Sequence, residues 1–104
     1  MLEIIRDRIS YELADGVARI ELCGPGIGNR LDLQMGQAVH QAAERAVRDA
    51  AAGTAQVVAV SARGSAFSVG GDLREFARAE DRGTYVRATA DELHAGLALL
   101  RADR

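Results

Sequence analysis

The sequence predicts an α/β fold in which an N-terminal β-hairpin is followed by strand–helix units. Residues 9–22 alternate between apolar and polar side chains on either side of Asp15-Gly16, a dipeptide typical of hairpin turns. Residues 32–53 place apolar side chains at steps of three and four, as one face of a helix does. Residues 56–62 are rich in β-branched side chains and almost free of polar ones, which predicts a parallel strand buried on both faces.

The composition is that of one globular domain. The 104 residues are 48% hydrophobic and 27% charged, whereas disordered chains are poorer in apolar side chains. Aromatic residues make up only 4%, so the core must be built from Ala with a few Leu, Ile and Val. A core of small side chains buries little area per residue, and we therefore expect a surface that a partner covers.

Charge and cysteine content exclude several classes of function. The net charge of -2 gives no general attraction to nucleic acid or to a membrane surface. All 13 basic residues are Arg, which excludes a Schiff-base lysine and leaves Arg as the side-chain cation for any phosphate. Cys23 is the single cysteine, so an internal disulfide is excluded, and the low cysteine content is typical of a protein in a reducing compartment. No long apolar run or signal-peptide pattern occurs, and we expect a cytoplasmic protein without a membrane span.

A glycine-rich loop follows the hairpin. Residues 1–8 are expected to form an edge strand or a loose lead-in before it. Residues 24–29, Gly-Pro-Gly-Ile-Gly-Asn, then interrupt regular structure between a strand and a helix. The dinucleotide-binding fingerprint would need glycine where Asn29 or Leu31 stands, and the mononucleotide P-loop needs a lysine. Nucleotide binding of either type is therefore not expected.

The first helix is expected to begin after Asp32 and to stop at Gly53. The Asp32 carboxylate can accept hydrogen bonds from first-turn amides, and Gly53 suits the position that follows a last turn. His40 lies beside the apolar face with no metal ligand at the required spacing, and we interpret it as a surface or boundary residue. The apolar face consists of Met35, Val39, Ala42, Ala43, Ala46, Val47 and Ala50.

The strand at 56–62 is expected to pair in parallel, with residues 24–53 as its right-handed crossover. A short helix over 73–79 capped by Asp72 should follow, and then a longer helix capped by Thr84. His94 again has the interpretation of a boundary residue. The expected apolar side of the longer helix consists of Val86, Thr89, Leu93, Leu97 and Leu100.

The segment Ser65–Phe76 is the candidate functional site. A strand that ends in a tight glycine turn and then opens a helix directs several free backbone N–H groups to one point. These groups and the helix dipole attract negative charge, either a phosphate or an oxyanion that develops on a carbonyl. Because the lysine and the glycine spacings of nucleotide sites are missing, the oxyanion is the favoured guest.

Residues Ala66–Phe76 resemble the Ala-Phe-small-small-Gly-Ala/Gly-Asp-Leu/Ile-Lys/Arg-Glu segment of the crotonase superfamily, the enoyl-CoA hydratases and isomerases. The hairpin, the loop with Asn29-Arg30-Leu31-Asp32 before a long helix, the strand at 56–62 and the final helix also occur in the order and spacing of that family. The resemblance implies the N-terminal part of a crotonase-like ββα spiral fold over residues 1–104.

The resemblance also implies roles for individual residues. Family members bind an acyl-CoA thioester and stabilise its enolate with two backbone N–H groups, and Gly71 occupies the position of one donor. Arg30 either pairs with a CoA phosphate or points to solvent, and Asp72 is either a helix cap or an acid–base group. The backbone of Ala66–Val69 should receive the adenine. The expected CoA-binding residues are Asn29, Arg30, Leu31, Ala66, Phe67, Ser68, Val69, Gly70 and Asp72, with no metal and no cofactor besides the CoA of the substrate.

Other parts of the family's machinery would lie beyond Arg104. These are the second oxyanion amide, the glutamates that act as general acid and base, and the helices that form trimers. We therefore expect a crotonase-like domain truncated at its C-terminus, which alone is not a competent hydratase. It would be a fragment, a truncated gene product or a subunit completed by a second chain. Expected partners are an acyl-CoA thioester and either such a second chain or further copies, a trimer or hexamer by resemblance.

Two functions remain compatible with the sequence. The first is an enoyl-CoA hydratase/isomerase-type protein of fatty acid metabolism, in which this chain supplies one oxyanion amide and part of the CoA site. The alternative is a non-catalytic crotonase-like module that binds CoA or serves assembly. The acyl chain length is not determined by these residues. Neither is the choice among hydration, isomerisation, decarboxylation and thioester hydrolysis.

Overall fold

A computed structural model describes residues 2–24, 29, 31–64 and 80–102. Its four strands are β1 (Leu2–Ile5), β2 (Ile9–Ala14), β3 (Val17–Leu22) and β4 (Val57–Ala62), and they form one sheet in the order β1-β2-β3-β4. Its two helices are α1 (Leu33–Ala51) and α3 (Arg82–Ala102). The short helix expected over 73–79 lies outside the described residues.

The N-terminal hairpin is confirmed. β2 and β3 pair antiparallel with Ala14 opposite Val17, so Asp15 and Gly16 form a two-residue turn. Their φ angles are 53° and 77°, the positive values that such a turn requires and that Asp-Gly tolerates well. β1 pairs antiparallel with β2 at one border of the sheet, which confirms an edge strand.

The expected crossover is also present. β4 pairs parallel with β3, from Val17 opposite Val57 to Leu22 opposite Ala62, and α1 connects the two strands. Asp32 caps α1 by accepting a hydrogen bond from the Met35 amide at 2.7 Å. The helix ends at Ala51, and Gly53 follows with a φ of 80°, as expected for a residue after a last turn.

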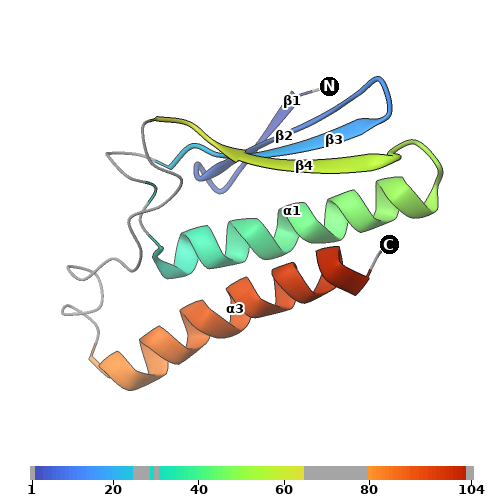
Figure 1. The fold of residues 1–104 in the computed structure, drawn as a ribbon. Coiled ribbons are helices and arrows are strands. Elements are labelled where there is room, and N and C mark those ends of the chain that lie inside the picture. Colours follow the sequence, from blue (N-terminus) through green and yellow to red (C-terminus); the bar gives the residue numbers. More distant parts are fainter. Residues whose placement is uncertain (1, 25–28, 30, 65–79, 103–104) are drawn as a thin grey trace.

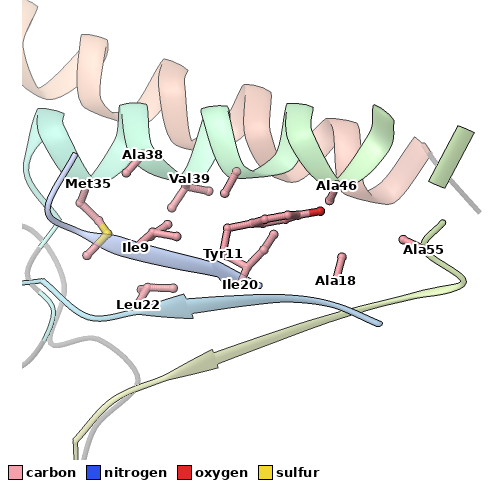
Figure 2. Close-up of a cluster of buried hydrophobic side chains, with 11 residues drawn as sticks. Ile9, Tyr11, Ala18, Ile20, Leu22, Met35, Ala38, Val39, Ala46 and Ala55 are labelled. Atoms are coloured by element: carbon pink, nitrogen blue, oxygen red, sulfur yellow. The ribbon is translucent and has the colours of Figure 1, made fainter. Parts of the chain in front are cut away.

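The two helices lie on the same side of the sheet, with α1 nearer to it (Figure 1). Figure 2 shows the main core, in which side chains of β2 and β3 meet those of α1. Burying these apolar side chains is the main stabilising contribution that the described residues supply. The core residues are Ile9, Tyr11, Ala18, Ile20, Leu22, Met35, Ala38, Val39, Ala42, Ala46 and Ala55.

The expectation that β4 is buried on both faces is wrong. Val57 is 57% exposed and Val60 is 47% exposed, although Val58 and Ala62 pack against the core. β4 is the border strand opposite β1, so among the described residues no further strand covers its outer side. The β-branched composition therefore predicted the strand correctly but not its surroundings.

Two details of α3 also differ from expectation. Asp81, and not Thr84, caps the helix, since its carboxylate accepts hydrogen bonds from the Thr84 amide at 3.1 Å and from the Thr84 hydroxyl at 2.8 Å. Thr89 is buried and Leu93 and Leu100 pack against the core, as expected, but Gly96 is also buried on this side, whereas Val86 and Leu97 are 41% and 51% exposed. In the described part of the chain, neither helix has the length and apolar character that a membrane span requires.

Candidate functional site

Two loops leave the sheet side by side at the carboxyl ends of its parallel strands. Leu22 at the end of β3 lies opposite Ala62 at the end of β4, and the Arg63 amide donates to the Leu22 carbonyl at 2.8 Å. The first loop leads toward Asn29–Asp32 and the second leads through Gly64 to the glycine motif of the sequence. Ligands of α/β proteins commonly bind at this end of parallel strands. The described geometry therefore brings to one edge the two chain exits that lead toward the predicted CoA-binding segments.

Asn29 connects these two loops. Its side-chain Oδ1 accepts a hydrogen bond from the Gly24 amide at 3.1 Å, and its Nδ2 donates to the Arg63 carbonyl at 3.1 Å. The residue is only 3% exposed and has a φ of 49°, in the left-handed region that Asn adopts more readily than most residues. The side-chain amide of Asn29 thus connects the backbone of the loop that follows β3 to the backbone of the loop that follows β4.

A second anchor holds the same loop where it enters α1. The Arg8 guanidinium, from the β1–β2 connection, pairs with the Asp32 carboxylate at 2.9 Å. The Arg8 carbonyl accepts a hydrogen bond from the Cys23 amide at 2.8 Å. Arg8 therefore fixes residues on both sides of the glycine-rich loop, close to its first and last residues.

The same contacts determine the ionisation of Asp32. Burial of the carboxyl group raises its pKa, but the hydrogen bonds from Arg8 and from the Met35 amide lower it further than burial raises it. The net result is a pKa below the ordinary value for Asp. Asp32 therefore stays ionised at neutral pH and serves as helix cap and ion-pair partner.

We expect Asp32→Ala to lower the free energy of unfolding by roughly 1–2 kcal/mol at pH 7, because it removes the cap and leaves Arg8 without this partner. A lowered folded-state pKa stabilises the protein above the unfolded pKa of about 4, and this stabilisation is lost as pH falls below that value. The difference between wild type and variant in urea unfolding should therefore shrink at about pH 3. Asp32→Asn, which keeps a cap oxygen but not the charge, should lie between them; an acid-independent difference would contradict this account.

An apolar cavity of about 170 Å³ lies between β3, β4, α1 and α3. It is close to the loop exits because Leu31, one of the predicted CoA-binding residues, forms part of its wall. The wall has no polar side chain, so the cavity can hold only apolar groups. It is lined by Ile20, Leu22, Leu31, Val39, Val60, Leu93, Leu97 and Leu100.

Of the predicted site residues, the structure describes Asn29 and Leu31. It brings both to the edge where β4 ends, but the Asn29 side chain contacts the protein's own backbone. The predicted roles of the other site residues remain predictions. Gly71, Arg30, Ala66, Phe67, Ser68, Val69, Gly70 and Asp72 lie outside the described residues.

Sequence reasoning missed Arg8 as an anchor of this region. No neighbouring residue indicates this role, because its partners Asp32 and Cys23 are distant in the sequence and meet Arg8 only in the folded chain. His40 was expected at a boundary and does lie there, with its Nδ1 at 2.7 Å from Glu92 Oε2 between α1 and α3. Within residues 2–24, 29, 31–64 and 80–102, no group of three His, Cys, Asp or Glu side chains could hold a metal ion.

The sequence and the fold of the chain were compared with those of known proteins. No protein-family model matches the chain. A trans-2-decenoyl-[acyl-carrier-protein] isomerase of Streptococcus mutans is 36% identical over 73 residues, which is 70% of this chain and 27% of that protein. An enoyl-CoA hydratase/carnithine racemase structure from Magnetospirillum magneticum matches with a TM-score of 0.80 and 24% identity, over 98% of this chain and 37% of the other.

A third match has higher identity than the Magnetospirillum structure. An enoyl-CoA hydratase structure from Shewanella pealeana is 27% identical, with a TM-score of 0.71 over 91% of this chain and 37% of that one. The chain thus spans about a third of the length of these proteins. Both the expected family resemblance and the expected fold class are confirmed. The chain resembles the N-terminal part of the enoyl-CoA hydratase/isomerase (crotonase) proteins in fold and in sequence.

Proposed function

We propose that the chain forms part of a binding site for an acyl-CoA thioester and that its Gly71 amide stabilises the enolate of that thioester. In the reaction, a base removes the proton next to the thioester carbonyl, and the electron pair moves onto the carbonyl oxygen. A backbone N–H group directed at that oxygen stabilises the charge where it develops. The base is not assigned to any residue of this chain.

One observation supports this proposal above others. In a chain with crotonase-like fold, the loop that contains Asn29 and Leu31 and the exit of β4 are joined at the same edge of the sheet. These exits lead to the two segments in which the sequence predicts contacts to CoA and to the thioester oxygen. An acyl-CoA, with its CoA part at one segment and its thioester at the other, is the ligand that the family resemblance favours.

Binding can be tested on the chain itself by titration calorimetry. Coenzyme A and acetoacetyl-CoA are the probes, and ATP and NAD are the controls. We expect binding of both CoA compounds but not of the controls. We also expect tighter binding of acetoacetyl-CoA, because its acidic thioester readily supplies an enolate oxygen. Absence of CoA binding would refute the proposal, and equal affinities would favour the alternative of a module that binds CoA without stabilising an enolate.

The oxyanion role predicts a difference between two substitutions of Gly71. Gly71→Pro removes the N–H group, whereas Gly71→Ala keeps it. A hydrogen bond to a charged group contributes about 1.5–3 kcal/mol, so the proline variant should lose roughly tenfold or more of its preference for acetoacetyl-CoA over coenzyme A. The alanine variant should retain that preference. If the proline variant lost affinity for both compounds equally, Gly71 would not be an oxyanion donor.

A further inference from the structure

We infer that Asn29 is a positioning residue: its side chain fixes the loop before α1 against the exit of β4 and so holds together the two chain exits from which the ligand site is built. The inference rests on the proposed function for the identity of the ligand. It differs from the sequence prediction, in which Asn29 itself contacts CoA. The carbonyl and the amino group of the Asn29 side chain have separate tasks, and an ionised carboxylate of the same size cannot perform both.

The hydrogen bonds define these tasks. Oδ1 accepts from the Gly24 amide and closes the glycine-rich loop upon itself, over five residues. Nδ2 donates to the carbonyl of Arg63, which is 34 residues away in the sequence. The Arg63 amide in turn donates to the Leu22 carbonyl, which continues the ladder between the parallel strands by one step. The amide of Asn29 therefore extends the strand pairing into the two loops.

Burial and backbone conformation favour a positioning role. Asn29 is 3% exposed, so its side chain presents almost no surface to a ligand. A φ of 49° is unfavourable for most side chains, and Asn and Asp are the residues that tolerate it best after glycine. Glycine at this position would permit the backbone but would provide no bridge to Arg63.

Two charged pairs surround the bridge. Arg8 and Asp32 pair at 2.9 Å on the side of α1, and the Arg63 guanidinium donates to Glu21 at 3.2 Å on the side of β3. In each pair the arginine also makes a backbone hydrogen bond at the end of β3: the Arg8 carbonyl accepts from Cys23, and the Arg63 amide donates to Leu22. A variant that changes only Asn29 leaves both of these ion pairs in place.

Asn29→Asp is the sharpest test, because Asp keeps the size, the tolerance for positive φ and the acceptor for Gly24. At about pH 7.5 the ionised carboxylate would place a negative oxygen against the Arg63 carbonyl. Burial at this site and the facing carbonyl oxygen would raise the pKa of the new carboxyl group above the ordinary value of about 4, so that at about pH 5 the protonated group donates to the Arg63 carbonyl again. With coenzyme A as the probe, we expect the dissociation constant of the variant to exceed that of wild type about tenfold at the higher pH. The ratio should fall toward one at the lower pH.

At each pH, the dissociation constant of the variant is divided by that of wild type, so that the effect of pH on coenzyme A itself cancels. Gln56→Glu is the matched control, since it introduces the same charge at the opposite end of β4 and should leave the ratio near one at both pH values. A variant of Asn29 with unchanged affinity would overturn the inference. So would a loss of affinity that does not recover at low pH, because that would indicate a general loss of folding.

A second measurement separates the inference from the proposed function. Amide hydrogen exchange of Gly24 and Arg63, measured without ligand, is compared as the ratio of variant to wild type at each pH. This ratio should exceed one at both amides in Asn29→Asp at the higher pH, because separation of the loop from the exit of β4 exposes both to water, and it should return toward one at the lower pH. If wild type binds no coenzyme A but this coupled change is seen, the proposed function fails and the bridge stands. If exchange at the two amides is independent, the bridge does not position the loops.

Discussion

Replacing Gly36 by alanine is expected to destabilise the protein by roughly 1–3 kcal/mol, because α1 and α3 cross in contact at this residue. A Cβ atom on Gly36 would lie 2.9 Å from the Thr89 carbonyl oxygen and 3.3 Å from the Cβ of Glu92. The nearer atom belongs to the backbone of α3 and cannot move without the helix. Gly36→Val should be worse, by about 3 kcal/mol or more, because its two further methyl groups meet the same wall.

The expected loss of stability in Gly36→Ala is opposite in sign to what helix propensity predicts. Helix propensity alone predicts that glycine to alanine stabilises a helix interior by up to about 1 kcal/mol. Gly83→Ala in the first turn of α3 is the matched control, since a Cβ there would meet only the Asp81 carboxylate at an ordinary 3.6 Å. Urea unfolding followed by circular dichroism should show a lower midpoint for Gly36→Ala and an equal or higher one for Gly83→Ala. A stabilised Gly36→Ala would show that the helices do not cross this closely.

A local readout accompanies the global one. The Leu33 amide donates to the Tyr85 hydroxyl at 3.1 Å, next to the crossing of the helices. If Gly36→Ala pushes α3 away, this hydrogen bond should weaken and amide exchange at Leu33 should accelerate more than exchange in β2 and β3. Gly96 forms a second close contact, with a hypothetical Cβ 3.0 Å from His40 Cα, and its alanine variant should behave in the same direction.

Features encoded by adjacent residues were predictable from the sequence. Asp15-Gly16 defines the hairpin because both residues tolerate positive φ, and Asp32 defines the start of α1 because its carboxylate reaches the Met35 amide. The prediction of Thr84 as the cap of α3 was wrong, although it too rested on nearby residues. Asp81 and Thr84 are both good capping residues three positions apart, and in the structure the carboxylate of Asp81 engages both the amide and the hydroxyl of Thr84.

Features that depend on distant neighbours were not predictable. The apolar steps in α3 indicated a helix and placed Thr89 correctly on its packed side, but close packing on α1 also buries Gly96 and leaves Leu97 half exposed. A count of apolar residues does not reveal that a glycine faces a neighbouring helix. Exposure of β4 likewise depends on what lies beside its border, which its own composition does not contain.

In the candidate site too, the sequence predicted what residue type and position determine, but not the contacts between distant segments. The family motif indicated that Asn29 belongs to it, because the residue type and the position match. Its hydrogen bond to Arg63 depends on the parallel pairing of β3 with β4, which brings two loop exits together from separate parts of the sequence. The ion pair of Arg8 with Asp32 likewise joins separate parts of the sequence, the β1–β2 connection and the start of α1.

Truncation of Tyr11 should have the largest effect in the core between the sheet and α1. Tyr11 is 1% exposed and is the largest of the fully buried side chains among the described residues. Figure 2 shows it lying across the core against α1. Tyr11→Ala should lower the free energy of unfolding by roughly 3–5 kcal/mol, as removal of buried aromatic side chains does. Unfolding in urea measures this loss, and a cost below that of an ordinary surface substitution would contradict the described packing.

Tyr11→Phe isolates the hydroxyl group, which donates to the Asp49 carboxylate at 2.6 Å. This variant should lose about 1–3 kcal/mol at pH 8 because Asp49 is then deprived of a donor. Burial, the hydrogen bond to Asp49 and the negative charge of Asp49 all raise the pKa of Tyr11, and they outweigh the opposing charges of Arg45 and Arg48. The folded state therefore favours the protonated phenol. The stability that this group contributes is fully present below the unfolded pKa of about 10.

Above that value the unfolded state can release the proton and the folded state resists, so wild type loses stability that Tyr11→Phe cannot lose. The difference between the two proteins should therefore be full at pH 8 and smaller at about pH 11. Tyr85 and the arginines are present in both and cancel from the difference. A constant difference across this range would mean that the phenol is as free to ionise in the folded protein as in the unfolded one. That result is incompatible with a hydroxyl group held 2.6 Å from a carboxylate in the core.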